Sequence, residues 1–353
     1  MFLSAKVTTE KCISLIQQAA ANGAHVVCFP ESFISAFPIW SALRPPTANH
    51  DLFKAMACES IHADGDEIHA IRAAAKQTGT IVSLGFSEKA RYSVATLFNS
   101  NLIIGEDGEV LVHHRKLMPT FFERLTWSAG DGHGLRVAAT RHGNIGALIC
   151  GENTNPLARY ALMAQRENLH ISTWPAIWPT RAPNFGATQS TDVAGTGLPK
   201  PANYNNVEAN RIRAAAHCFE AKTFGLLCSG VLGQDAIDTV TTGSADPQAM
   251  SDFLAKAPRG ASMFLDPTGA PSPSFVVSSE GVKEPRDMLQ AEEGILYADM
   301  DFEACIEGKQ YHDVVGGYQR LDVFDLKVDR SRREPVTFTE RVSEASSNTN
   351  AAC

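Results

Sequence analysis

The chain has 353 residues and a formal net charge of −8, from 31 lysines and arginines against 39 aspartates and glutamates. This acidic balance argues against non-specific binding to nucleic acid or to an anionic membrane surface. Hydrophobic residues make up 44% and charged residues 20% of the sequence, which is typical of a globular protein and not of a disordered one. No apolar run approaches the roughly 18 residues of a membrane span, and no basic region followed by an apolar stretch opens the chain, so we expect neither a membrane segment nor a signal peptide.

Cysteine usage indicates a reducing compartment. None of the eight cysteines stands in a CxxC pair, so zinc-ribbon and thioredoxin-like sites have no support. The simplest interpretation is that most of these thiols are buried and reduced, which predicts a cytoplasmic protein.

Helices and strands alternate in the first part of the chain. Apolar residues at helical spacing predict helices over 9–22 and 66–78, each followed by a glycine that can end it. Short apolar runs predict strands over 24–29 and 80–86. Residues 94–115 are predicted to form a β-hairpin around the turn Gly105-Glu106-Asp107-Gly108.

The same rhythm continues to the C-terminal region. The sequence predicts helices over 157–167, opened by Pro156, and over 206–222, together with strands over 145–149, 170–174, 224–229, 263–265 and 294–300. Residues 182–204 are polar and rich in Gly and Pro, which favours a long surface loop within the domain. No fixed-period repeat and no domain boundary is visible, so we predict one layered α/β or α+β domain over 1–339 and a disordered tail over 340–353.

Three reactive side chains each follow a short apolar strand. Glu31 ends Phe29-Pro30-Glu31, Lys116 follows the returning strand of the hairpin, and Cys150 follows the run 145–149. Ligand crevices form where strands end, and burial in such a place would perturb the pKa of a carboxylate or a lysine. Taken alone, each residue has a plainer interpretation: a solvated glutamate, a surface basic cluster, and one of eight ordinary thiols.

Cys150 has the most specific context of the three. A glycine, Gly151, follows it, and a helix opens a few residues later. This arrangement is similar to a nucleophile elbow, in which the side chain is exposed on a tight turn and the next backbone N–H can stabilise an oxyanion. A nearby helix N-terminus would favour the reactive thiolate.

The order Glu, Lys, Cys, each after a strand, resembles the nitrilase (carbon–nitrogen hydrolase) superfamily from about Thr9 to Leu326, and the nitrilase branch of fungal type in particular. The motifs that carry the resemblance are Phe29-Pro30-Glu31, Arg115-Lys116-Leu117-Met118-Pro119-Thr120 and Cys150-Gly151-Glu152-Asn153. Further matching segments are Glu123-Arg124, Gly130-Asp131-Gly132, His170-Ile171-Ser172-Thr173-Trp174-Pro175, 214–220 and Asp313-Val314-Val315-Gly316.

The resemblance implies an α/β fold, a four-layer αββα sandwich, with the active site at the strand ends. It implies Cys150 as nucleophile, Glu31 as general base, Lys116 as the stabilising cation and Glu123 as a second glutamate near the thiol. The Gly151 N–H would help to stabilise the nitrogen of the intermediate. No cofactor and no metal is expected, and the family implies a homodimer or a larger spiral homo-oligomer.

The implied reaction is hydrolysis of an organic nitrile to a carboxylic acid and ammonia through a thioimidate and a thioester on Cys150. Three alternatives stay open from the sequence: a cyanide hydratase, an amidase of the same family, and a catalytically inactive assembly protein. The last is considered because family members begin with a strand before the first helix, whereas this chain begins at Met1 after that strand or repairs the sheet with residues 2–7. A second departure lies at Gly317 and Leu321, where many nitrilases have His and Pro.

Two other features carry less weight. His113-His114 lies in the same region as Glu123 and Cys150, but no His-x₃-His spacing or Cys pair supports a metal site. Trp174 ends a predicted strand next to that of Cys150 in the family arrangement, so we place it at the wall of the substrate pocket. Core packing is the plainer interpretation of this tryptophan.

Overall fold

The strands of the chain form two main sheets. The computed structural model describes residues 2–179, 204–244, 246–336 and 339. The first sheet has the strand order β1–β2–β3–β4, with β1 (Val26–Cys28), β2 (Ile81–Lys89), β3 (Leu97–Ile104) and β4 (Val110–Arg115). The second has the order β5–β6–β7–β8–β9, with β5 (Ala138–Thr140), β6 (Gly143–Ile149), β7 (Leu169–Trp174), β8 (Phe224–Ser229) and β9 (Met263–Leu265).

Parallel pairing places several strand ends at one edge of the molecule. β1 runs parallel to β2, with Val27 opposite Val82, and β6, β7 and β8 are parallel to one another. Every other pairing within the two sheets is antiparallel. A parallel pair requires a crossover, and α5 (Pro156–Met163) and α6 (Asn206–Ala221) supply the crossovers of the second sheet.

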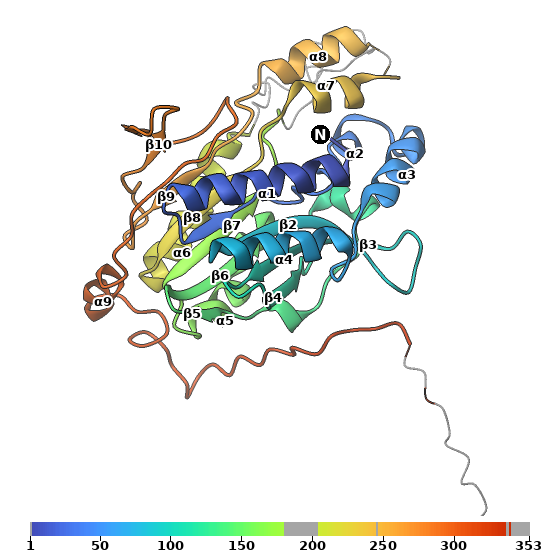
Figure 1. Ribbon diagram of the computed structural model, residues 1–353. Helices are drawn as coiled ribbons and strands as arrows, with labels where there is room; N and C mark the ends of the chain where they lie inside the picture. The colour runs from blue at the N-terminus through green and yellow to red at the C-terminus, as the bar shows by residue number, and fades with distance from the viewer. Residues whose placement is uncertain (1, 180–203, 245, 337–338, 340–353) are drawn as a thin grey trace, which may run out of the picture.

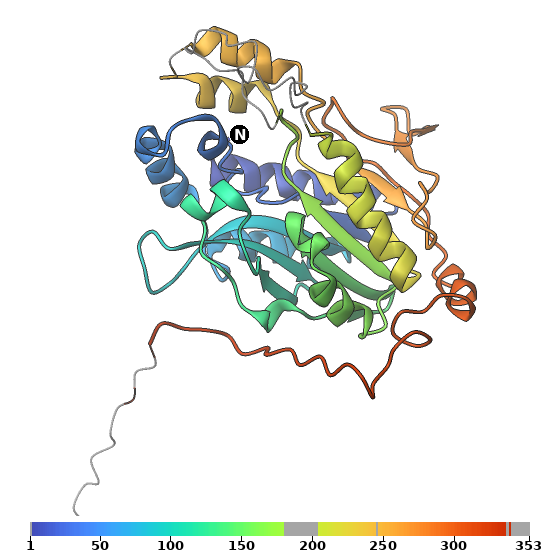
Figure 2. The ribbon, with the colours of Figure 1, turned by 180° about the vertical axis from the view of Figure 1, so that it is seen from behind.

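Two helices cover the outer face of each sheet. In Figure 1, α1 (Ala5–Ala21) and α4 (Asp66–Thr78) lie in front of the first sheet, and in Figure 2 α5 and α6 lie in front of the second. Together these layers form the αββα sandwich, so the fold expected from the resemblance is confirmed.

Side-chain alternation along β2 explains the layering. Val82, Leu84 and Phe86 point to one face and join the buried core under α1 and α4, whereas Ile81 points to the opposite face and packs between the sheets with Ile145. Each of these side chains is 1% exposed or less, and burying one stabilises the fold by roughly 1.5–3 kcal/mol.

Helix α4 shows how local sequence sets an element. Its apolar residues at helical spacing, Ile68, Ile71, Ala74 and Ala75, are all buried. Gly79 then adopts a φ of +63°, a left-handed conformation that glycine tolerates and that ends the helix where the sequence predicted.

The remaining elements were not predicted from the sequence. The other helices are α2 (Trp40–Leu43), α3 (His50–Glu59), α7 (Gln234–Thr241), α8 (Pro247–Ala255) and α9 (Ala304–Glu307). The 3₁₀ turns are η1 (Pro46–Ala48), η2 (Phe121–Leu125), η3 (Gly132–Gly134), η4 (Cys150–Thr154) and η5 (Gly308–Gln310), and a separate two-stranded sheet joins β10 (Phe275–Val277) to β11 (Lys283–Pro285). Among the described residues, no helix combines the length and the apolar character needed to cross a bilayer.

Two element predictions were wrong in part. Residues 294–300 form no strand; Tyr297 alone makes an isolated bridge, to Phe275. The helix predicted over 157–167 ends at Met163, and the residues after it turn back toward β7. The predicted loop over 182–204 lies outside the described residues except for its last position, and the predicted tail over 340–353 lies outside them entirely.

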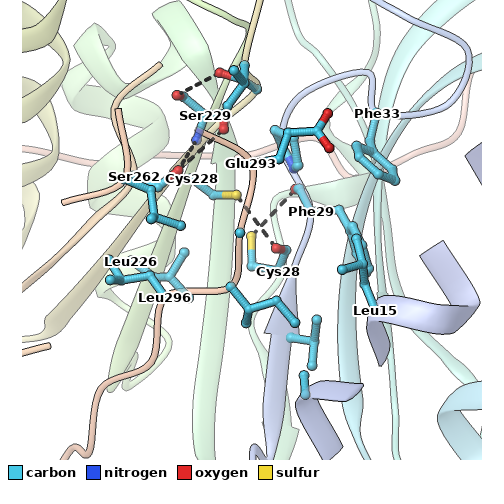
Figure 3. A pocket seen from close by; sticks show the side chains of 18 of the residues that line it. Leu15, Cys28, Phe29, Phe33, Leu226, Cys228, Ser229, Ser262, Glu293 and Leu296 are labelled. Carbon is cyan, nitrogen blue, oxygen red and sulfur yellow. Dashed lines mark hydrogen bonds between the residues drawn. The ribbon is translucent and has the colours of Figure 1, made fainter. Parts of the chain in front are cut away.

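Within the described residues, strand β1 pairs with β2 alone, so its other edge is open, and a cavity of about 970 Å³ lies along that edge. Its walls come from β1, α1, β8 and residues 292–300 (Figure 3). There the Cys228 thiol donates to the Cys28 carbonyl oxygen at 3.6 Å. Residues 5–7 begin helix α1 and do not repair the sheet as a strand. The absence of the family's first strand and the domain bounds 1–339 stay predictions.

Candidate active site

The three predicted residues meet at the ends of their strands. Glu31 follows β1, Lys116 directly follows β4, and Cys150 directly follows β6. Lys116 Nζ lies 2.8 Å from Glu31 Oε1 and 2.7 Å from Glu123 Oε2. A carboxylate oxygen of Glu31, one of Glu123 and the Cys150 sulfur all lie within 4.8 Å of one another. One lysine therefore joins two carboxylates beside a thiol.

Strand β3 holds this cluster in place through Asn99. The Asn99 amide donates to Glu31 Oε1 at 2.6 Å, and its backbone carbonyl accepts from the Lys116 N–H at 2.7 Å. Asn99 is 1% exposed. Sequence reasoning missed this residue, because nothing in its local context separates it from other polar residues on an inward-facing strand.

Glu31 is poised to accept a proton. Its Oε1 is held by Asn99 and Lys116, whereas its buried Oε2 has no hydrogen-bond partner within the described part of the chain. Burial raises the pKa of the Glu31 carboxyl to about 7, since it outweighs the opposing effect of the Lys116 ammonium, and the Glu123 charge adds to the rise. A base with this pKa is matched to proton transfer near neutral pH.

Lys116 stays charged despite complete burial. Burial alone would lower its pKa, but the Cys150, Glu31 and Glu123 groups around it raise the pKa well above its usual value. A permanent cation of this kind stabilises negative charge that develops beside it.

Cys150 rests as a thiol on a strained turn. Its φ of +52° is unusual for a residue with a side chain, and Cys150, a half-buried residue, lies at the start of η4. Burial and the Glu31 charge raise the pKa of the Cys150 thiol, while Lys116 and the Gly151 N–H lower it. Activation of the thiol therefore needs a base, and Glu31 is adjacent.

Glu123 is fixed by the turn in which it lies. It is the third residue of η2, and its Oε2 accepts from the Thr120 backbone N–H at 3.0 Å as well as from Lys116. This capping arrangement satisfies one donor at the start of the turn. Glu123 therefore cannot move away from Lys116 without also losing its hydrogen bond to the Thr120 N–H.

Comparison with known proteins is consistent with this geometry. The family model described as "Carbon-nitrogen hydrolase" matches residues 3–310. An arylacetonitrilase from Hypocrea virens is 31% identical over 99% of this chain and 94% of its own length. A nitrilase from Penicillium rubens is 32% identical over 94% of this chain and 90% of its own length.

The chain belongs to the carbon–nitrogen hydrolase family. A solved carbon–nitrogen hydrolase from Helicobacter pylori G27 has the same fold, with a TM-score of 0.61 at 16% identity over 90% of this chain and 92% of that one. This chain is therefore an enzyme that acts on carbon–nitrogen bonds, as the sequence motifs predicted.

The structure also indicates a role for Glu152, which the sequence analysis quoted within a motif without assigning it one. Glu152 accepts from the backbone N–H groups of Leu117 and Ile149, at 2.6 and 2.9 Å, and from His114 Nε2 at 2.9 Å. One buried carboxylate therefore ties the loop after Lys116 to the turn of Cys150. The sequence signal that could have identified Glu152 was its position within the motif Cys150-Gly151-Glu152-Asn153.

His113 and Trp174 take no part in the hydrogen bonds between Lys116 and the two glutamates, although the Glu31 backbone N–H donates to the Trp174 carbonyl oxygen at 3.3 Å. His113 Nε2 bonds to Glu88 at 2.8 Å, so the two neighbouring histidines serve different carboxylates. Trp174 is 1% exposed, in the core cluster against which Cys150 packs. Its place at the substrate wall stays a prediction.

Proposed function

We propose that this chain hydrolyses an organic nitrile to a carboxylic acid and ammonia. The observation that carries the proposal is the Cys150 sulfur within 4.8 Å of a Glu31 carboxylate oxygen, in a cluster with the Lys116 ammonium. Among the described residues Glu31 Oε2 has no hydrogen-bond partner, so it can accept the proton of the thiol. The matching relatives are named nitrilases and arylacetonitrilases, which favours a nitrile over other carbon–nitrogen substrates.

The first half of the reaction forms a thioimidate. Glu31 takes the Cys150 proton as the sulfur attacks the nitrile carbon, and the C≡N bond becomes C=N. The nitrogen gains the electron pair and then a proton from the acid form of Glu31. Lys116 and the Gly151 N–H stabilise the charge on nitrogen while it forms.

The second half consumes two water molecules. Glu31 removes a proton from the first water, which adds to the thioimidate carbon to give a tetrahedral adduct. The adduct expels ammonia, once its nitrogen is protonated, and leaves a thioester. A second water, activated in the same way, releases the carboxylic acid and returns the thiol. Expulsion of the sulfur in place of ammonia would release an amide.

Glu123 completes the charge balance of the site. If Glu31, Glu123 and the Cys150 thiol were all ionised, three negative charges would face the single positive charge of Lys116 in a buried space. The Glu123 carboxylate therefore holds Lys116 and disfavours premature ionisation of the thiol. We assign it this role and not that of a second nucleophile.

Aromatic side chains next to the cluster favour a substrate with an aromatic group. The ring centroids of Phe37 and Trp178 lie 5.3 Å apart, and both residues line the cavity beside β1, as Glu31 does. Phe122, the neighbour of Glu123, packs 6.1 Å from Trp178. We place Trp178 and Phe122 at the substrate wall together with the predicted Trp174.

Product analysis tests the function. The purified chain is incubated with phenylacetonitrile, a short aliphatic nitrile, the matching amides and cyanide, and acid, amide and ammonia are measured. Acid plus ammonia from a nitrile supports the proposal, and Cys150→Ala must abolish it. Formamide from cyanide alone, turnover of amides alone, or no turnover at all would instead support the cyanide hydratase, the amidase or the inactive assembly protein.

We also propose that the protein is cytoplasmic and forms a homodimer or a larger homo-oligomer. Support for assembly comes from apolar side chains within residues 318–326, where Leu321 is 79% and Phe324 72% exposed. Light scattering on a size-exclusion column measures the mass of the particle, and a mass of one chain at micromolar concentration would contradict assembly.

A further inference from the structure

A chain of buried polar groups lies behind the Cys150 turn. Asn153 donates from Nδ2 to the carbonyl oxygens of Leu148, at 3.2 Å, and Cys150, at 3.0 Å. Its Oδ1 accepts from His170 Nε2 at 2.9 Å and from the Ser172 hydroxyl at 3.0 Å. The Asn153 side chain is fully buried, with every one of these bonds inside the protein.

The series of buried hydrogen bonds extends farther from the active site through Glu167. His170 Nδ1 is hydrogen-bonded to Glu167 Oε1 at 2.8 Å, and His217 Nε2 is hydrogen-bonded to Glu167 Oε2 at 2.6 Å. Glu167, His170 and His217 are each 3% exposed or less. Gly146 makes room for the carboxylate, since a Cβ there would lie 2.0 Å from Glu167 Oε1.

These partners determine the protons on His170. The two carbonyl oxygens can only accept, so the Asn153 amide can face them only with its NH₂ group. His170 Nε2 must then donate to Asn153 Oδ1. Contacts with His170 and His217 lower the pKa of Glu167 to about 2 against the effect of burial, so Glu167 is ionised and Nδ1 donates as well.

The Asn153 contact reaches the reaction through one peptide plane. The carbonyl oxygen of Cys150 and the N–H of Gly151 belong to the same rigid, planar peptide unit and point in opposite directions. A hydrogen bond that fixes the oxygen also fixes the direction of the N–H. That N–H already acts on the Cys150 sulfur in the resting state, since it lowers the pKa of the thiol.

We propose that Glu167, His170 and Asn153 are positioning residues, which hold the Cys150–Gly151 peptide so that the Gly151 N–H points at the reacting atoms. Asn153 acts directly on the peptide, His170 acts through Asn153, and Glu167 acts through His170. The expected effect on turnover rests on the proposed function. The expected effect on the reactivity of the Cys150 thiol does not depend on the substrate.

The first test measures the thiol without any substrate. Iodoacetamide alkylates Cys150, and peptide mapping separates this cysteine from the others. Asn153→Ala is expected to slow alkylation at pH 7 about tenfold, because a donor to the thiolate is misdirected. Asn101→Ala is the matched control. It removes a buried amide whose side-chain partner among the described residues is Ser83, and it is expected to leave the rate unchanged. This readout keeps its meaning even if nitriles prove not to be the substrate.

The second test measures turnover per reactive thiol. Loss of one oxyanion donor lowers kcat by roughly 10²–10³-fold, so Asn153→Ala is expected to lower kcat about 100-fold with KM changed less than about threefold. His170→Gln is expected to lower kcat about tenfold, since the donor to Asn153 is displaced. In the Asn153→Ala background the same change is expected to have less than about a twofold effect, because its route to the peptide is gone.

Glu167→Gln separates orientation from charge. The glutamine can accept from His217 through its oxygen and donate to His170 Nδ1 through its NH₂ group, and His170 can still donate from Nε2 to Asn153. Kinetics within about threefold of the wild type would support positioning. Three results would overturn the proposal. The first is that His170→Gln and Asn153→Ala lower kcat independently, so that their effects multiply, and the second is that Cys150 in Asn153→Ala is alkylated at the wild-type rate. The third is a stoichiometric metal ion bound to Glu167, His170 and His217 that a chelator removes together with activity.

Discussion

The Lys116 ammonium lies 2.8 Å from Glu31 Oε1, while the second oxygen of the same carboxylate has no partner among the described residues. The lysine therefore holds Glu31 in place without occupying the oxygen that can take a proton. Burial offsets the attraction of the cation, which is why the pKa of Glu31 is raised to about 7 and not depressed. A buried cation and a usable base can coexist for this reason.

The pH dependence of kcat/KM is expected to report Glu31. Only the carboxylate form accepts a proton, so kcat/KM should rise about tenfold per pH unit below about 7 and level off above it. Asn99→Ala removes a hydrogen bond that lowers the pKa of Glu31, so the rising limb should move to higher pH. Stopped assays of ammonia release across pH 5–9 measure both profiles. A limb that stays in place or moves to lower pH in Asn99→Ala would contradict the assignment.

Replacing the sulfur by oxygen tests the nucleophile. Cys150→Ser retains nearly the same shape, but an alkoxide is far harder to generate than a thiolate beside a base whose pKa is about 7. We expect kcat to fall by at least about 10³-fold, with a fold whose circular dichroism is unchanged. Intact mass during turnover should show a covalent adduct on wild-type protein and none on the variant. Persistent ammonia release from Cys150→Ala would exclude Cys150.

Space next to the nucleophile is limited by Thr120. A Cβ on Gly151 would lie 2.8 Å from Thr120 Oγ1. Gly151→Ala should therefore displace either the turn that carries the candidate N–H donor or Thr120, which precedes η2. We expect kcat to fall by about 10–100-fold. Thr120→Ala, added to Gly151→Ala, removes the obstructing oxygen and should recover part of the loss. A double variant slower than the product of the single effects would show that Thr120 contributes in another way.

The sequence identified the reacting groups because their contexts are local. Glu31, Lys116 and Cys150 each follow a short apolar strand, and strand ends gather at one edge of a layered fold. Their burial, and hence the direction of each pKa shift, depends on neighbours that come from other strands. Asn99 is an example: its contact with Glu31 spans 68 positions, and no local pattern indicates it.

The supporting groups were missed for a related reason. Glu167 meets His217 across 50 positions, through a gap that Gly146 leaves open on a third element. The strand predicted over 294–300 is the opposite case, in which the sequence predicted an element that does not form. An apolar run becomes a strand only if another strand pairs with it. There Tyr297 alone finds such a partner. Periodicity predicts what a segment can form, and tertiary pairing decides whether it forms.

Substrate preference is expected to depend on Trp178. Its ring packs 5.3 Å from Phe37 and 6.1 Å from Phe122, which is next to Glu123. An aromatic substrate would gain roughly 0.5–1.5 kcal/mol from such a ring beyond simple burial. Trp178→Ala should therefore lower kcat/KM for phenylacetonitrile about tenfold more than for a short aliphatic nitrile. Equal losses for both substrates would place Trp178 in structural packing and away from the substrate.

Removing the Glu31 charge is expected to stabilise the fold in a pH-dependent way. The pKa of Glu31 is raised from 4.5 to about 7 in the folded protein, so at pH 5 the folded protein holds this carboxyl protonated, and the side chain resembles a glutamine. Above about pH 7 the folded protein must bury the charge, at a cost on the order of 1.4 kcal/mol per unit of pKa shift. The melting temperature of Glu31→Gln should thus be close to that of the wild type at pH 5 and clearly higher at pH 8. The exposed Glu280 provides the control, and Glu280→Gln should follow the wild type at both pH values. A Glu31→Gln advantage that is the same at pH 5 and pH 8 would show that Glu31 keeps an ordinary pKa, and the role of general base would then need another residue.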